Sequence, residues 1–168
     1  MRWHWLVLAT TALLFLVVGI AVLTPRYVAA RHADECMRHV RSLMSVLNMY
    51  CEDYDGYMPL PPHKEDPSDR WTLCWGDVLQ PYIAVTYASA NGSDNPYERE
   101  VYYCPLDRTQ RWLGSYVMPR YIFGKRLADL KKQHKVVFYE DQPRHDGKRT
   151  VGFADGTVKL MEYEPEGQ

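Results

Sequence analysis

Residues 5–23 form an almost wholly apolar run that carries no charged side chain. At a rise of about 1.5 Å per residue, a helix of this length is just long enough to cross the hydrocarbon core of a bilayer. A helix that is apolar on every side would need far more protein around it than a chain of 168 residues provides. The run therefore predicts a membrane span rather than a buried core helix.

Such a span is either an uncleaved anchor or a secretory signal that is removed. Val28-Ala29-Ala30 resembles a small-residue cleavage site. The apolar run, however, is longer than a usual secretory core, and residues 25–27 intervene before the alanines. We therefore expect residues 1–30 to be an uncleaved membrane anchor and residues 31–168 to be the globular domain. A mature chain that starts near Arg31 is the alternative.

A helical pattern continues beyond the apolar run. Over residues 26–54, apolar side chains recur at helical spacing while charged side chains fall elsewhere on the turn. The apolar positions are Cys36, Val40, Leu43, Met44, Leu47, Cys51 and Tyr54. Pro25 has no backbone donor, so a break is expected between the two helical segments. The turn pair Asp55-Gly56 predicts the end of the second helix.

The C-terminal part of the chain has short β-type runs. We expect strands at residues 101–104, 115–123, 136–139, 150–154 and 157–161, short helical turns at 78–83 and 127–132, and loops at 63–70 and 88–100. Asp155-Gly156 predicts a two-residue hairpin turn in which both residues have positive φ. A small sheet has an apolar face to cover, and the stripe of the helix can cover it. The predicted fold is therefore α+β, with a long N-terminal helix packed on a small C-terminal antiparallel sheet.

Charge gives little information about partners. The chain is near balance, with Lys+Arg 20 against Asp+Glu 21, and it has no basic run with interleaved aromatics, so a nucleic-acid partner is not expected. Several arginines follow the apolar run, and by the positive-inside rule this count places the domain in the cytoplasm. The even number of cysteines, Cys 4, is instead typical of an oxidising compartment.

Several motifs together resemble one known family. His145, nine further residues and then Asp155-Gly156 resemble the C-terminal signature of the prepilin-like proteins that are named for this motif. In the same order, the chain has ECMRHVRSLMSVLNMYCEDYDGYMP, WTLCWGDVLQPYI and YYCPLD, which resemble that family's helix, its Trp-containing segment and its Cys-Pro-x-Asp motif. The resemblance covers roughly residues 30–163.

The resemblance implies a pilin-like fold and a structural role like that of the pseudopilins of type II secretion. It implies a single-pass protein of the bacterial inner membrane, with its C-terminal domain outside the cytoplasm, without a cofactor and without catalytic residues. Its implied partners are the membrane and other pseudopilin-like or secretion-system proteins. The N-terminus, MRWHWLVLATTALL, departs from the family because it lacks the Gly-Phe-Thr-Leu-x-Glu site at which a prepilin peptidase cuts.

Two sets of polar residues are candidate sites. His145 and Asp155 can be a catalytic or ligand pair, but the Asp155-Gly156 and Asp55-Gly56 pairs also fit turn chemistry, and no third catalytic group is evident. The structural interpretation is favoured for these residues. The acids Asp53, Asp55, Glu140 and Asp141 are candidate Ca²⁺ ligands, although they lack the remaining ligands of an EF-hand loop.

The cysteines allow a geometric argument. Cys36 and Cys51 lie about 22 Å apart along one helix, so they cannot bond to each other. Two pairings remain: Cys36–Cys104 with Cys51–Cys74, or Cys36–Cys74 with Cys51–Cys104. The family resemblance favours Cys36–Cys104, and four reduced, buried thiols are the alternative. A zinc site and a cysteine nucleophile are not expected, because the sequence has no Cys-x-x-Cys pair and no identifiable His partner for a nucleophilic cysteine.

The aromatic residues suggest a second type of function. Exposed rings can bind a glycan or a peptide, and the candidates are Trp71, Trp75, Tyr82, Tyr102, Tyr103 and Trp112. An anchored extracytoplasmic binding module is therefore the alternative to a structural pseudopilin-like protein. Packing in a small core is the more ordinary role of such rings. An envelope enzyme ranks last because the sequence shows no catalytic constellation.

Overall fold

The computed structural model describes residues 2–60, 75–76, 78–83, 101–107 and 114–165, and for residues 2 and 4–10 it describes the backbone alone. The chain divides into two compact units, Met1–His32 and Ala33–Gln168. The predicted loops at residues 63–70 and 88–100 lie outside the described residues.

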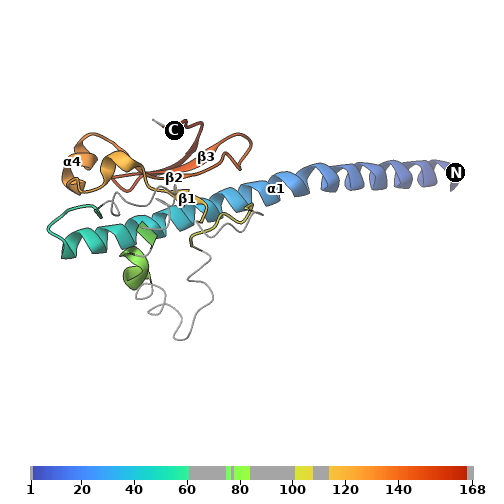
Figure 1. The fold of residues 1–168 in the computed structure, drawn as a ribbon. Helices are drawn as coiled ribbons and strands as arrows, with labels where there is room; N and C mark the ends of the chain where they lie inside the picture. Colours follow the sequence, from blue (N-terminus) through green and yellow to red (C-terminus); the bar gives the residue numbers. More distant parts are fainter. Residues whose placement is uncertain (1, 61–74, 77, 84–100, 108–113, 166–168) are drawn as a thin grey trace. The chain divides into compact units, whose positions relative to one another are not determined.

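The first helix, α1 (Arg2–Asp53), contains Pro25 in its interior, so the expected break near this proline is not present (Figure 1). Proline removes only one backbone donor, and the hydrogen bonds of the remaining turns are enough to continue a long helix. In the same turn, the hydroxyl of Thr24 donates a 2.6 Å hydrogen bond to the carbonyl oxygen of Ile20.

The first unit contains the one described stretch that is long and apolar enough to cross a membrane, with a mean hydropathy of 2.0 over its most apolar window. Every residue from Thr11 to Val28 is exposed except Gly19, which is half-buried. Trp3 is also exposed. Membrane anchors and signal sequences both have this length and composition.

A left-handed turn ends α1 close to the predicted position. Asp55 has φ 53° and Gly56 has φ 80°, and the Gly56 N–H donates a 2.7 Å hydrogen bond to the carbonyl oxygen of Cys51. This six-to-one hydrogen bond, with a left-handed residue before its donor, is the pattern of a Schellman C-cap. The chain then turns back, and the Met58 N–H donates to the Lys125 carbonyl oxygen at 2.9 Å.

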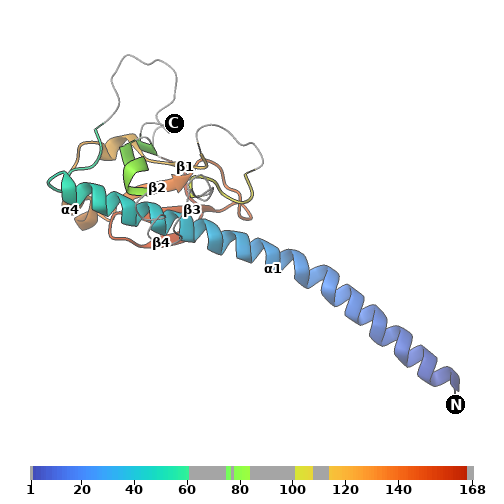
Figure 2. The same ribbon diagram turned by 90° about the horizontal axis from the view of Figure 1, so that it is seen from below.

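The second unit holds a four-stranded antiparallel sheet in the order β1-β2-β3-β4 (Figure 2). Its strands are β1 (Tyr116–Val117), β2 (Val136–Glu140), β3 (Arg149–Phe153) and β4 (Val158–Met161). A 3₁₀ turn, η1 (Arg120–Ile122), and a short helix, α4 (Leu127–Lys132), connect β1 to β2. The predictions of a short helix at residues 127–132 and of strands near 136–139, 150–154 and 157–161 are confirmed.

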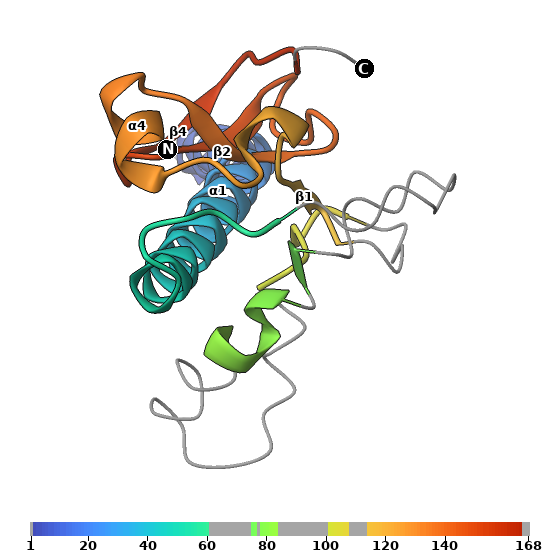
Figure 3. The same ribbon diagram turned by 60° about the vertical axis from the view of Figure 1, so that its left-hand side comes forward.

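The C-terminal part of α1 covers one face of this sheet (Figure 3). Its buried stripe includes Val40, Leu43, Met44 and Leu47, which join Phe138 of β2 in the main core. Further core residues come from the segment before the sheet and from α4: Trp75, Leu79, Ile83, Leu127 and Leu130. The predicted α+β arrangement, a long helix packed on a small antiparallel sheet, is therefore confirmed.

Three local predictions are wrong. Residues 101–104 lie in a turn rather than a strand, and only Tyr116–Val117 of the predicted 115–123 strand pairs with a neighbour. The β3–β4 hairpin has a three-residue loop, because the Gly156 N–H donates to the Phe153 carbonyl oxygen and the Phe153 N–H to the Thr157 carbonyl oxygen. Only Gly156 has positive φ there, at 90°, as in a type I turn followed by a glycine bulge.

A bulge in β2 changes which of its side chains face α1. Val136 pairs with Phe153 and Phe138 pairs with Gly152, so β2 advances two residues while β3 advances one. As a result Val137 and Phe138 both join the core against α1, whereas Val136 and Tyr139 join a smaller apolar cluster elsewhere on the sheet. By strand alternation, Glu140 then points to the same side as Phe138.

Candidate functional site

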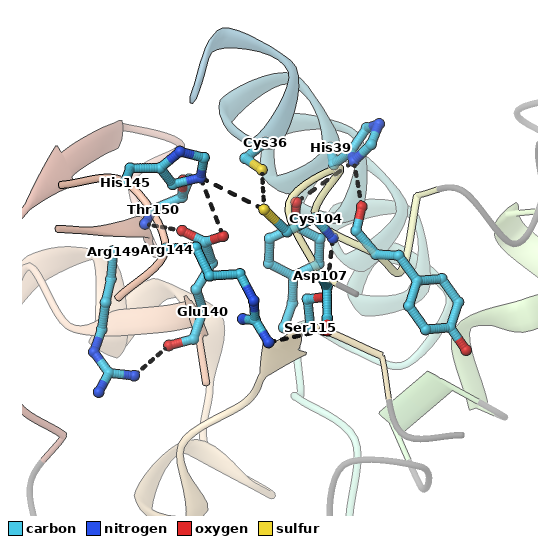
Figure 4. Close-up of polar contacts among 12 residues, drawn as sticks. Cys36, His39, Cys104, Asp107, Ser115, Glu140, Arg144, His145, Arg149 and Thr150 are labelled. Atoms are coloured by element: carbon cyan, nitrogen blue, oxygen red, sulfur yellow. Dashed lines mark hydrogen bonds and ion pairs between the residues drawn. The ribbon is translucent and has the colours of Figure 1, made fainter. Parts of the chain in front are cut away.

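Two thiols, a carboxylate and an imidazole meet in a buried cluster (Figure 4). We call it the Cys–His–Glu cluster; it consists of Cys36, Cys104, Glu140 and His145. One potential ligand atom from each residue lies within 4.8 Å of the other three, and all four residues are buried. Within the described part of the chain, this is the one group of three or more His, Cys, Asp or Glu side chains with metal-binding spacing.

The two cysteines come from segments far apart in sequence. Cys36 lies on α1, just before the core stripe, and Cys104 begins a turn in which the Asp107 N–H donates a 2.8 Å hydrogen bond to the Cys104 carbonyl oxygen. Pro105 occupies the second position of this turn, where its fixed φ is favourable. The two sulfur atoms are 2.9 Å apart.

Glu140 is aimed into the cluster by the β2 bulge and is held there by β3. Its Oε2 accepts a 2.6 Å hydrogen bond from the Thr150 N–H. The carboxylate thus replaces the backbone carbonyl oxygen that would usually accept this bond between two strands. Its Oε1 lies 3.3 Å from the Nε2 of His145 but has no well-formed hydrogen bond among the described residues. Arg149 donates to the backbone carbonyl oxygen of Glu140 at 2.7 Å.

His145 is positioned by a tight turn. Asp146 and Gly147 have φ values of 50° and 80°, and His145 and Lys148 exchange both of their backbone hydrogen bonds, at 3.2 and 2.9 Å. Positive φ at both central residues is the type I′ geometry that was expected for the Asp155-Gly156 pair. The turn aims the imidazole inward, and its Nε2 lies 3.6 Å from the Cys104 sulfur.

A polar network holds the Cys104 turn in place. Ser115 accepts a 2.9 Å hydrogen bond from the Cys104 N–H and donates one of 2.7 Å to the carboxylate of Asp107. Arg144 donates to the same carboxylate at 2.8 Å and also pairs with Asp141. The side chains of Asp107 and Arg144 are only 2% and 9% exposed, so this ion pair is largely withdrawn from water.

The protonation of the cluster follows from its contacts. Burial opposes a charge on His145, but its hydrogen bond with Cys104 and its ion pair with Glu140 outweigh this effect and raise its pKa to about 9. Burial also disfavours ionisation of Glu140, yet the ion pair with His145 and the hydrogen bond from the Thr150 N–H hold its pKa below the ordinary value. The hydrogen bond from the Cys36 thiol, together with that from His145, lowers the pKa of Cys104 to about 7 despite burial. The pKa of Cys36 is raised, first by its hydrogen bond to Cys104 and then by burial.

The predicted His145–Asp155 pair does not meet. His145 lies in the Cys–His–Glu cluster, whereas Asp155 lies in the β3–β4 loop, where it accepts a hydrogen bond from the Thr157 N–H at 2.9 Å and contacts His134 at 3.1 Å. Asp155-Gly156 forms part of a hairpin loop and Asp55-Gly56 forms the helix cap, so each pair has a backbone role in this structure.

The candidate calcium ligands do not form one group. Asp53 accepts a 2.7 Å hydrogen bond from the Tyr82 hydroxyl, Asp55 lies in the cap of α1, and Asp141 pairs with Arg144. Glu140 lies in the Cys–His–Glu cluster instead. None of Asp53, Asp55 and Asp141 belongs to a ligand group within the described residues.

The predicted Cys36–Cys104 disulfide is not formed, although the two residues are adjacent. Their sulfur separation of 2.9 Å exceeds the bond length of about 2.05 Å in a disulfide. Cys51 is a free, buried thiol near the Met58 sulfur, at 3.9 Å, and Cys74 lies outside the described residues. Cys104 therefore neighbours Cys36 and not Cys51, which argues against the alternative pairing of Cys36–Cys74 with Cys51–Cys104.

The aromatic residues that the structure describes include one that is clearly part of the core. Trp75 is 2% exposed and packs on Phe138 and Tyr102, with ring centroids 5.0 and 5.7 Å apart. Tyr82, Tyr102 and Tyr103 are half-buried, and the other two candidates, Trp71 and Trp112, lie outside the described residues.

Local spacing did not reveal the cluster. Closely spaced ligands are the sequence signal of a metal site, but Cys36, Cys104, Glu140 and His145 come from four separate segments. The direction of Glu140 depends on the bulge, so the sequence indicates this residue only as a calcium candidate. The Asp146-Gly147 pair was a usable signal for the turn that holds His145, since Asp-Gly is typical of type I′ turns.

Comparisons with protein-family models, with curated proteins and with solved structures found no match to this chain.

Proposed function

We propose that this chain is a membrane-anchored, pseudopilin-like structural protein of a secretion system or another cell-envelope assembly, and that it is not an enzyme. One observation carries the proposal. A single helix, α1, has an exposed apolar stretch at residues 11–28 and, between Cys36 and Cys51, a stripe that is buried against an antiparallel sheet. A helix that is apolar on all sides at one end and amphipathic at the other fits a lipid-embedded anchor joined to a folded domain.

The proposed location is the bacterial inner membrane, with the domain on the outer side. The resemblance of the motifs around Cys36, Cys104 and His145 to those of prepilin-like proteins supports this orientation. The arginines that follow the apolar run favour the opposite one, so orientation must be measured.

The proposed partners are other pseudopilin-like or secretion-system proteins with membrane helices. In lipid, such helices associate by side-chain packing rather than by the hydrophobic effect. The prepilin-type Glu that would pair subunits is missing from the apolar run, so association through that group is not part of the proposal.

The buried positions of the polar groups support a structural role. All four members of the Cys–His–Glu cluster are buried, as are polar groups that hold a core together. The burial of Trp75 likewise removes one of the rings on which a glycan-binding surface would depend.

The test compares the full chain with a variant in which a cleavable soluble leader replaces residues 1–30. We expect the full chain to stay in membranes after alkaline extraction, to be cross-linked there to other envelope proteins, and to activate an alkaline phosphatase fused after Gln168. The leader variant is expected to be released and to lose the cross-links. Extraction of the full chain by alkali, or an inactive phosphatase fusion, would contradict the proposal.

A further inference from the structure

We propose that Cys36, Cys104, His145 and Glu140 bind one Zn²⁺ ion through their sulfur, Nε2 and carboxylate oxygen atoms. Two thiolates, an imidazole and a carboxylate are the ligand types that zinc prefers in proteins. The four groups come from α1, the Cys104 turn, the end of β2 and the His145–Lys148 turn. A bound ion would therefore link α1 to the Cys104 turn, to the end of β2 and to the His145–Lys148 turn.

Two of the distances between ligand atoms already match a tetrahedral site. Zinc bonds of about 2.3 Å to sulfur and about 2.0–2.2 Å to nitrogen or oxygen place neighbouring ligand atoms about 3.3–3.8 Å apart. The distance from Cys104 Sγ to His145 Nε2 is 3.6 Å, and that from His145 Nε2 to Glu140 Oε1 is 3.3 Å. All of the ligand atoms lie within 4.8 Å of one another.

The distance between the two sulfur atoms, 2.9 Å, is longer than that in a disulfide and shorter than that in a zinc dithiolate. Closing it by about 0.9 Å gives a disulfide, and opening it by about 0.9 Å gives a zinc dithiolate. A disulfide would use two of the four groups and leave the Glu140 Oε1 buried beside them. Among the described residues that oxygen is paired only with His145 Nε2, at 3.3 Å and outside good hydrogen-bond geometry, and it is directed at the cluster, which favours a ligand that also engages the carboxylate.

The outer contacts of the cluster are those that a metal site needs. The Thr150 N–H holds the Glu140 Oε2 and leaves Oε1 for the ion, while Ser115 holds the Cys104 N–H. Such contacts fix ligand direction before the ion arrives. Arg149 donates to the Glu140 carbonyl oxygen, which fixes the backbone at this ligand.

Binding is a ligand exchange and needs no oxidant. The ion enters, the thiol protons and the proton on His145 Nε2 leave to solvent, and four metal–ligand bonds form. Since the protein supplies all four ligands, no position is open for a substrate, as in structural zinc sites. The ion is expected to stabilise the fold, because binding to the native state alone raises its stability.

The experiment uses the full-length chain in detergent, reduced and stripped of metal with a chelator, and titrates it with Co²⁺ as a spectroscopic probe for zinc. We expect one Co²⁺ per chain, with a thiolate-to-cobalt charge-transfer band and the intense visible bands of tetrahedral cobalt. Zn²⁺ is expected to displace the cobalt and to raise the Tm of the chain.

Variants assign the ligands. Cys36→Ser and Cys104→Ser are each expected to weaken the charge-transfer band, and Glu140→Gln is expected to weaken binding by roughly 100-fold or more. Cys51→Ser is the matched control, because Cys51 is also buried on α1 but lies outside the cluster, and it should bind as the wild type does. Circular dichroism of each variant separates loss of a ligand from loss of the fold.

Two results would overturn the proposal. One is a reduced, folded wild-type chain that shows no charge-transfer band and no rise in Tm with Zn²⁺. The other is a Cys36–Cys104 disulfide found by peptide mass analysis in essentially all of the chain isolated from membranes of zinc-supplied cells. Neither result bears on the anchor, so failure of the zinc site and failure of the proposed function are distinguishable.

Discussion

Gly152 of β3 and Val40 of α1 approach so closely that a Cβ added to Gly152 would lie 2.6 Å from the Val40 Cγ1. The sheet can lie this close to the helix because β3 has no side chain at that point. Gly152→Ala is therefore expected to lower the free energy of unfolding by about 1–3 kcal/mol, measured by urea unfolding of the full chain in detergent.

Two controls test the cause of that loss. Gly76→Ala places a Cβ at 3.6 Å from the Tyr102 ring, an ordinary contact, and is expected to have little effect. Val40→Ala combined with Gly152→Ala should recover part of the loss, because the collision is relieved. A double variant that is simply the sum of two losses would show that the collision is not the reason.

The ion pair between Asp107 and Arg144 is expected to be important for stability. Both side chains are largely buried, and without the Asp107 charge Arg144 keeps only Asp141 as an ion-pair partner among the described residues. Asp107→Asn should therefore destabilise the chain by about 1.5–3 kcal/mol, the contribution of a hydrogen bond to a charged group. Asp129→Asn removes an exposed pair with Lys132 and should cost about 1 kcal/mol or less. Thermal unfolding of the two variants measures both losses of stability. Equal losses would contradict the prediction that the buried pair contributes more than the exposed one.

The cap of α1 gives a prediction about Asp55. Its φ of 53° is easily adopted by glycine and poorly by a β-branched residue. Asp55→Gly should leave stability unchanged or raise it, and Asp55→Val should lower it by about 1–2 kcal/mol. Glu52→Val, within the preceding helical turn, is the control and should change stability by about 0.5 kcal/mol or less.

The same variants also test the calcium hypothesis. If Asp55 has only a backbone role, Ca²⁺ should not change the Tm of the wild type, and Asp55→Gly should respond to Ca²⁺ in the same way. A Ca²⁺-dependent rise in Tm that disappears in Asp55→Gly would assign the residue to a metal site.

Cys51 is expected to be unreactive in the folded chain. Burial raises the pKa of its thiol from 9.0 to about 11, so almost no thiolate is present at pH 8. Because the folded state favours the neutral thiol, its contribution to stability is complete below pH 9.0 and is lost as the pH rises through about 11. Peptide mass analysis should find Cys51 alkylated only as fast as the chain unfolds, and alkylation at the rate of an exposed cysteine would refute this.

Periodicity predicted the elements that have a strong local pattern. The apolar stripe from Cys36 to Cys51 gave the helix face, and the turn pair Asp55-Gly56 gave its end. The β-branched and aromatic run at residues 136–139 gave β2. These features follow from short-range preferences, so a single sequence reveals them.

Other features depend on contacts that no local pattern contains. The helix continues through Pro25 because neighbouring turns keep their hydrogen bonds. The β2 bulge turns Glu140 inward, and only tertiary packing determines that direction. The cluster needs Cys36, Cys104, Glu140 and His145 to converge from four segments, so the cysteines were predicted as a pair but the carboxylate and the imidazole were not joined to them.

The central claim, that the apolar half of α1 is retained as a membrane anchor, is tested most directly by the mass of the mature N-terminus in protein isolated from membranes. We expect a chain that still begins at Met1, with or without a formyl group, and therefore retains residues 5–23. A chain that begins near Arg31 would contradict the proposed anchor, because the apolar stretch would then be a removed signal and the domain would be secreted.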